Sequence, residues 1–299
     1  MRVSEKQRYN LTESRIAKTK AQNAKQLETI STQQKILRLS DDPIGAGQAI
    51  REKSTLKDIQ QYTKNLEYSK GYIERTETSL VAINDFLMRA KELAVSLSNA
   101  TYGDKARGGA AGEVREIIDA VVALGNTAYA GRYVFGGFRT RTPPVNSDGQ
   151  FLGDDGAIFL QIDDNSFRQI NIQARELFEP DPQERQEGRF GMIPTLEILH
   201  DGLKFNDIQK IRKGITELDF QLDKASSYQA ILGSIYNALE SAIERQEHSE
   251  IQTTERLSNI TDADTYKATS DFKKTETVLQ STLLASNKLL QPSLLNFLQ

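Results

Sequence analysis

The sequence predicts a mainly α-helical protein with a small β insert, drawn out into an elongated rod. Apolar residues recur at helical spacing through both halves of the chain, and Gly and Pro break up a shorter stretch between them. Aromatic residues make up 7% of the 299 residues and Trp is absent, which suits helices that bury a single stripe. A β segment between two helical arms implies a chain that runs out and returns. We therefore expect the N- and C-terminal helices to pair as a coiled coil.

The N-terminal arm, residues 1–40, is expected to be one helix of modest amphipathicity. Its apolar residues at coiled-coil spacing are Ile16, Leu27, Ile30 and Leu37. Three polar residues interrupt them, namely Lys20, Asn23 and Gln34. Because such a seam is too polar for a stable isolated coil, we expect the arm to become ordered only against a partner.

A strong helix-start signal follows at Ser40, Asp41, Asp42 and Pro43. Asp42 can cap the helix, and Pro43 suits its first position. No further Pro occurs before Asn99, which allows a single helix ~80 Å long. Its expected apolar stripe is Leu56, Ile59, Leu66, Ile73, Leu80, Ile83, Leu87, Ala94 and Leu97. Gly71 lies within this helix at a cost of ~1 kcal/mol.

A second helix is expected after the turn at residues 99–104, and it should end at Gly131. Its stripe is Ala110, Val114, Ile117, Val121, Leu124 and Ala128. Residues 139–191 then change character, because Gly and Pro separate short apolar runs at 157–162 and 167–172. This pattern predicts a small antiparallel β module, with a polar loop at 179–191 leading out of it.

The C-terminal half contains the longest heptad run, over residues 208–243, which weakens at Gln246, Glu250 and Thr253. The last segment has a stripe of its own, formed by Phe272, Leu279, Leu283, Leu290, Leu294 and Phe297. Pro292 is expected to kink or end that final helix. The stripe residues of both terminal arms are therefore candidate assembly residues.

Three domains are expected from this layout. They are 1–40 with 261–299 as a terminal coiled-coil assembly domain, 41–138 with 192–260 as a long-helix domain, and 139–191 as an outer β domain. The division follows the changes in periodicity along the chain.

The sequence lacks the residues that catalysis and metal binding ordinarily need. The chain has no Cys, and its two histidines, His200 and His248, have no second ligand at metal-binding spacing. The acidic pairs at 154–155 and 163–164 lack the spacing of a calcium loop and fit turns instead. We expect no catalytic, cofactor-binding or metal-binding residues, and therefore no enzyme.

The charge pattern gives no indication of a nucleic-acid or membrane partner. The net charge is −3. The nine Lys/Arg against three Glu in residues 1–40 could bind an acidic partner, a membrane or RNA, but a solvated helix face is the favoured interpretation. No run reaches the ~18 apolar residues of a membrane span. The start at Met1, Arg2 and Val3 lacks the apolar core of a secretory signal. We expect a chain that is cytosolic, or exported without a cleaved signal peptide.

Five short segments, in this order, resemble the flagellin superfamily and specifically its hook-associated protein 3 family of hook–filament junction proteins. They are Ile30-Ser31-Thr32 with Ser40-Asp41-Asp42-Pro43-Ile44-Gly45-Ala46, Gln61-Tyr62-Thr63-Lys64-Asn65, Arg89-Ala90-Lys91-Glu92-Leu93, Gly131-Arg132-Tyr133-Val134-Phe135-Gly136-Gly137, and the terminal helix over 262–298. The resemblance covers essentially the whole chain. It departs at Gln33-Gln34-Lys35, where the family usually has a Gly-Lys pair.

The resemblance implies a structural protein of the bacterial flagellum that joins the hook to the flagellin filament. The implied partners are hook-associated protein 1, flagellin, further copies of the chain in a ring, and a cytosolic export chaperone that binds the C-terminal segment. It also implies type III export and an extracellular location.

Three other functions stay open. A minor flagellin is the nearest alternative, although flagellins usually have a different sequence motif where this chain has Pro43. A coiled-coil adaptor could show similar heptads but would not need a β insert between two helical arms. An enzyme would need a site that the sequence does not suggest.

Overall fold

In the computed structural model the chain divides into two compact units, and the structure describes residues 2–98, 103–146 and 149–290. The terminal unit comprises residues 1–57 and 250–299, and the central unit comprises residues 58–249. Most of the chain is helical, with two small antiparallel β pairs, which confirms the predicted fold class of long helices with a β insert. The finer division into three domains stays a prediction.

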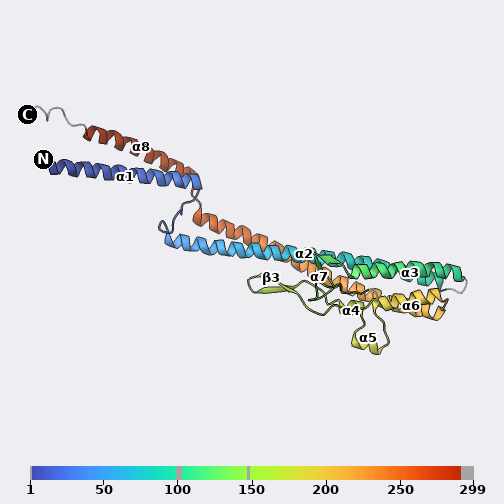
Figure 1. The fold of residues 1–299 in the computed structure, drawn as a ribbon. Helices are drawn as coiled ribbons and strands as arrows, with labels where there is room; N and C mark the ends of the chain where they lie inside the picture. The colour runs from blue at the N-terminus through green and yellow to red at the C-terminus, as the bar shows by residue number, and fades with distance from the viewer. Residues whose placement is uncertain (1, 99–102, 147–148, 291–299) are drawn as a thin grey trace, which may run out of the picture. The chain divides into compact units, whose positions relative to one another are not determined.

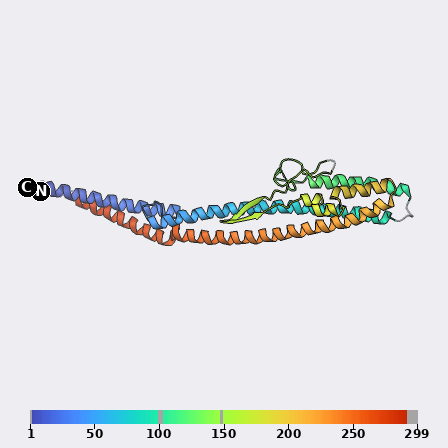
Figure 2. The same cartoon turned by 90° about the horizontal axis from the view of Figure 1, so that it is seen from below.

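The terminal unit contains the N- and C-terminal helices, which lie side by side and run in opposite directions (Figures 1 and 2). They are α1 (Arg2–Thr32) and α8 (Thr265–Leu290). The predicted pairing of the terminal helices is therefore confirmed.

The prediction that the first helix continues to residue 40 was wrong, because α1 ends at Thr32. Gln33 has a φ of 57°, in the left-handed region, and this conformation stops the helical hydrogen bonding. Residues 33–42 form a linker instead.

Two very long helices cross from one unit into the other along the chain. They are α2 (Pro43–Leu97) with 55 residues and α7 (Ile208–Thr261) with 54 residues. As predicted, α2 starts at Pro43, and the Asp42 carboxylate accepts hydrogen bonds from the amides of Ile44 and Gly45. The helix forms because its heptad-spaced apolar residues, among them Leu66, Leu80 and Leu87, are fully buried.

The central unit packs these helices around one apolar core with α3 (Asp104–Gly125) and α6 (Met192–Lys204). On α7 the heptad positions form the core: Ile211, Leu218, Ala225, Leu232 and Leu239 are buried. The run continues past residue 243 with polar residues, because Gln246 and Thr253 are also buried. Gln246 donates a hydrogen bond from Nε2 to the carbonyl of Ile162 at 3.0 Å, which compensates for its burial.

The prediction that the second helix extends to Gly131 was also wrong. The helix ends at Gly125, and Ala128 belongs to β1 (Ala128–Tyr129), which pairs with β2 (Arg132–Tyr133). The Asn126 side chain bonds to both the N–H and the C=O of Val145, at 2.9 and 2.8 Å. These long-range bonds draw the backbone out of the helix.

The predicted β module is present as a hairpin of β3 (Phe159–Asp163) and β4 (Ser166–Gln169). Asn65 of α2 donates to the carbonyl of Gln161 at 2.7 Å, which together with Gln246 fixes the hairpin on the long helices. Two short helices follow, α4 (Arg175–Phe178) and α5 (Pro182–Gln186).

The polar segment after α4 is held firmly on α7. Lys224 of α7 bonds to the Glu184 carboxylate at 2.7 Å, and both side chains are largely buried. Arg189 bonds to Glu217 at 3.3 Å and lies over the ring of Phe220. The predicted loop at 179–191 is therefore an ordered part of the central unit.

Candidate assembly surface

The contact between α1 and α8 is built by a regular heptad face on each helix. On α1 the residues that are at least half-buried at steps of four and three are Thr12, Ile16, Thr19, Asn23, Gln26 and Ile30. On α8 the matching residues are Ala268, Phe272, Thr275, Leu279, Thr282 and Ser286. We call these twelve residues the terminal seam. Such spacing keeps one face of each helix against its partner.

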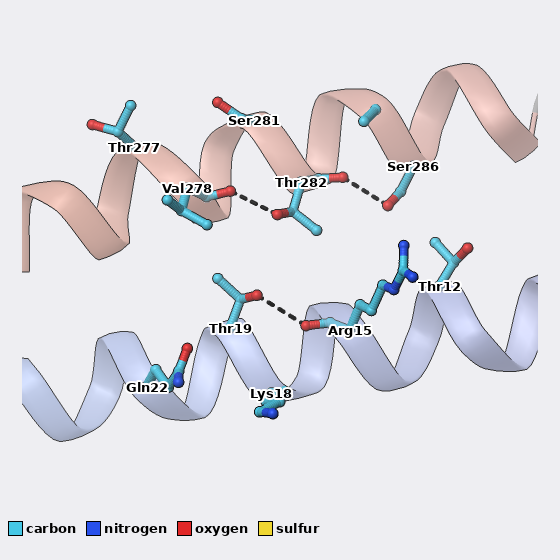
Figure 3. Close-up of a pocket in the computed structure, with 11 residues that line it drawn as sticks. Thr12, Arg15, Lys18, Thr19, Gln22, Thr277, Val278, Ser281, Thr282 and Ser286 are labelled. Carbon is cyan, nitrogen blue, oxygen red and sulfur yellow. Dashed lines mark hydrogen bonds between the residues drawn. The ribbon is translucent and has the colours of Figure 1, made fainter.

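The terminal seam is unusually polar. It has four large apolar side chains, Ile16, Ile30, Phe272 and Leu279, and otherwise mainly hydroxyl and amide groups. The Asn23 side chain reaches the Thr275 hydroxyl at 3.4 Å, which fixes the register of the two helices. Hydroxyls of Thr19, Thr282 and Ser286 bond back to their own helices and so need no partner across the seam (Figure 3).

A groove of about 520 Å³ runs along one side of the seam. Small side chains leave room for it, among them Ser281, Ala285 and Ser286 of α8 (Figure 3). Arg15 and Lys18 of α1 line the same groove, which gives it a basic edge. The two helices thus touch along a narrow line instead of closing over a dry core.

The predicted assembly residues fall into three groups. Ile16, Ile30, Phe272 and Leu279 lie half-buried in the terminal seam. Leu27 and Leu283 lie off it and are 53% and 47% exposed, while Leu37 is half-buried in the linker beyond α1. Leu290 is the last residue of α8, and Leu294, Phe297 and Pro292 lie outside the described residues. Their role in assembly stays a prediction.

Sequence reasoning missed most of the seam's polar residues. Thr12, Thr19, Thr275, Thr282 and Ser286 have no hydrophobic signal, but they fall at the same steps of four and three as the apolar residues. Lys20, which was expected to interrupt the seam, is exposed and lies off it.

The residues of the helix-start motif shape the linker between α1 and α2. Asp41 accepts a hydrogen bond from Lys25 Nζ at 2.6 Å and from the amides of Leu37 and Arg38 at 3.3 and 3.1 Å. The bond from Lys25 and that from the Arg38 amide hold the pKa of the Asp41 carboxyl below its ordinary value. Ser40 lies in the turn of this linker, and Asp42 and Pro43 start α2.

The same linker is joined to the segment between α7 and α8. Lys35 N–H donates to the carbonyl of Thr261, and Ala263 N–H donates to the carbonyl of Gln33, both at 2.8 Å. Asp262 beside them accepts bonds from Ser258 and Thr261, which lower the pKa of its carboxyl. The two linkers thus form a clamp at the base of the α1–α8 pair.

Large apolar side chains also remain on the outer faces of the terminal unit. They include Tyr9, Leu11 and Leu27 on α1, Tyr266, Val278, Leu283 and Leu284 on α8, and Leu39, Ile44 and Ile50 near the linker. Among the described residues there is no group of three or more acidic or His side chains placed to bind a metal. No helix within the described ranges has the length and apolarity needed to cross a bilayer. The exposed apolar side chains of the terminal unit are surface that the described part of the chain leaves uncovered.

Comparison with known proteins matches this arrangement. The model of the bacterial flagellin N-terminal helical region matches residues 3–140, and the model of the flagellin C-terminal helical region matches residues 215–298. Together they cover roughly three quarters of the chain. The chain belongs to the flagellin family.

Within that family, a full-length relative is flagellar hook-associated protein 3 of Escherichia coli K12. It is 25% identical over 95% of this chain and 96% of its own length. Flagellin of Bacillus subtilis is 23% identical over 90% of this chain and 89% of its own length. The solved structure of a putative flagellar hook-associated protein from Vibrio parahaemolyticus shares the fold, with a TM-score of 0.68 and 16% identity over 74% of this chain and all of that one.

These comparisons confirm the resemblance to hook-associated protein 3 within a flagellin-like family, and the solved structure shows that the fold is shared. The relatives are structural flagellar proteins, so this chain is a structural protein and not an enzyme. It is a component of the bacterial flagellum.

Proposed function

We propose that this chain is the structural subunit that joins the flagellar hook to the flagellin filament, and that it assembles through its terminal unit. The observation that carries the proposal is the α1–α8 pair. Its seam is polar and narrow, and large apolar residues such as Leu27, Leu283 and Leu284 remain on its outer faces. Covering these side chains with neighbouring subunits would remove apolar surface from water and stabilise the assembly.

The proposed partners are hook-associated protein 1 on the hook side, flagellin on the filament side, and further copies of the chain in a ring. A cytosolic chaperone would cover the C-terminal segment before type III export to the cell exterior. A narrow polar seam suits this route, because the terminal helices gain little from pairing inside one chain and more from packing among several. The three-domain division, with residues 139–191 as an outer module, belongs to the same proposal.

A minor flagellin is the second candidate, because flagellin of Bacillus subtilis also matches most of the chain. The motif around Pro43 favours the junction protein. There the Asp41 carboxylate accepts a hydrogen bond within the linker turn, and Asp42 caps the helix that starts at Pro43.

Deletion of the gene in the source bacterium tests the proposal. We expect bare hooks by electron microscopy and flagellin lost into the medium, with filaments restored by the wild-type gene. Normal filaments on the deletion strain would overturn the junction role and would leave the minor flagellin as the better candidate.

A further inference from the structure

The two units of the chain differ in the sign of their charge. Residues 1–57 and 250–299 contain 17 Lys/Arg against 12 Asp/Glu, whereas residues 58–249 contain 21 against 29. A basic surface and an acidic surface on the same chain allow one copy to attract another.

One face of α1 carries a basic stripe. Leu11, Arg15, Lys18 and Gln22 follow one another at steps of four, three and four, and all are exposed. Arg15, Lys18 and Gln22 line the groove beside the terminal seam (Figure 3). Arg15 and Lys18 make no ion pair within the part of the chain that the structure describes, so both charges are available to a partner.

One face of α7 carries the complementary acidic stripe. Glu240, Glu244, Glu247 and Ile251 follow at steps of four, three and four, and all are exposed, Ile251 to 58%. They lie away from the buried positions of α7, such as Leu239 and Ala242. Glu240 lies 3.5 Å from Lys70, whereas Glu244 and Glu247 have no ion pair among the described side chains.

The two stripes match when the helices run in opposite directions. Leu11 then meets Ile251, Arg15 meets Glu247, and Lys18 meets Glu244, with Gln22 opposite Glu240. Equal steps along both helices keep all four pairs in register. A single contact would therefore cover two exposed apolar side chains and neutralise four unpaired charges.

We infer that the α1 stripe of one copy docks on the α7 stripe of a neighbouring copy as an antiparallel helix pair. The inference names a contact for the proposed assembly of this chain and rests on that proposed function. An unrelated acidic helix would satisfy Arg15 and Lys18 but would leave the α7 stripe unexplained. A second copy explains both stripes at once.

Cysteine cross-linking tests the contact in assembled flagella, because the chain has no Cys of its own. The test variant combines Lys18→Cys with Glu244→Cys. The matched control combines Lys20→Cys, at an exposed position off the basic stripe, with Glu244→Cys. Each is expressed in the deletion strain, and purified flagella are oxidised and blotted from a non-reducing gel.

The expected result is a ladder of cross-linked multimers for the test variant and monomer for the control. Normal filaments without a ladder, or equal ladders in both variants, would overturn the inference while leaving the proposed junction role intact. Filaments that remain normal in the untransformed deletion strain would instead contradict the proposed function.

Charge reversal tests the same contact independently, in case either cysteine variant fails to assemble. Arg15→Glu with Lys18→Glu should weaken self-association of the full-length chain at least about tenfold. Adding Glu244→Lys and Glu247→Lys should restore it, and high salt should weaken the wild-type contact. Failure of the acidic-to-basic changes to restore association would overturn the inference.

Discussion

The side-chain amide of Asn23 on α1 donates a hydrogen bond to the hydroxyl of Thr275 on α8, across 3.4 Å and 252 positions of sequence. This polar contact lies in the middle of the terminal seam, where a coiled coil would ordinarily place Leu or Ile. A buried or half-buried Asn in a helical seam fixes register at a cost in stability. The polar contact therefore sets the register of the two terminal helices, while the seam holds them together only weakly.

Replacement of this pair by leucines should strengthen the α1–α8 contact. We expect Asn23→Leu with Thr275→Leu to stabilise the terminal pair by about 1–2 kcal/mol, because two more apolar side chains enter the seam. Slower amide exchange along α1 measures the gain. Lys20→Leu is the control, since Lys20 lies off the seam and should change little. Equal or faster exchange in the double variant would show that the seam is not the limiting contact.

The same double variant should also assemble less well in cells. A tighter pair within one chain competes with packing among several chains, so filament restoration in the deletion strain should fall below that given by wild type. Counting filamented cells by electron microscopy measures this. Full restoration would mean that the weak seam has no part in assembly.

The linker clamp should respond to acid. The folded-state pKa of Asp41 lies below its ordinary 3.8, so its carboxylate stabilises the linker fully above that pH and loses the contribution as pH falls through the folded-state pKa. At neutral pH, Asp41→Asn should speed exchange of the Leu37 and Arg38 amides that bond to Asp41. Glu255→Gln, at an exposed position, serves as control. Unchanged exchange in Asp41→Asn would contradict the assigned role.

Glycine-to-alanine changes at two positions should shift the free energy of unfolding in opposite directions. A Cβ at Gly71 would lie 2.3 Å from the Tyr129 hydroxyl, so Gly71→Ala should destabilise the central unit although Ala favours helices. Gly112→Ala in α3 meets nothing within 4 Å and should stabilise by about 0.5–1 kcal/mol. Chemical denaturation of the two variants gives both signs. A stabilising Gly71→Ala would contradict the packing of Tyr129 on α2.

Neighbouring positions on α7 provide a test of the core. Leu232 is fully buried and Ile231 is 49% exposed. We expect Leu232→Ala to cost about 2–5 kcal/mol and Ile231→Ala about 0.5 kcal/mol or less. Thermal unfolding separates them. Similar losses at the two positions would show that the predicted heptad phase of α7 is incorrect.

Much of the fold followed from periodicity, and the exceptions have physical causes. The stripe from Ile59 to Leu97 predicted α2, and every member of it is buried. On α7 alternate members of the predicted run, from Ile211 to Leu239, are buried, whereas those between them, such as Leu222, are half-buried. The ends of α1 and α3 were missed. Gln33 adopts a left-handed conformation next to the clamp, and Asn126 is bound by Val145, and neither long-range contact is visible in local sequence.

The candidate site could be predicted only in part. Ile16, Ile30, Phe272 and Leu279 stood out by hydropathy and do lie in the seam. Leu27 also stood out by hydropathy, but it lies off the seam and its side chain is 53% exposed. The hydroxyl residues of the seam have no hydropathy signal, so only the phase of the heptads on both helices could identify them.

The position of the protein in the intact flagellum distinguishes a junction protein from a filament subunit. An epitope tag inserted after Glu187, in an exposed part of the central unit, should leave the terminal unit unchanged. Immunogold labelling of whole flagella should place the label at the single boundary between hook and filament. Label distributed along the filament would contradict the junction role and identify the chain as a filament subunit.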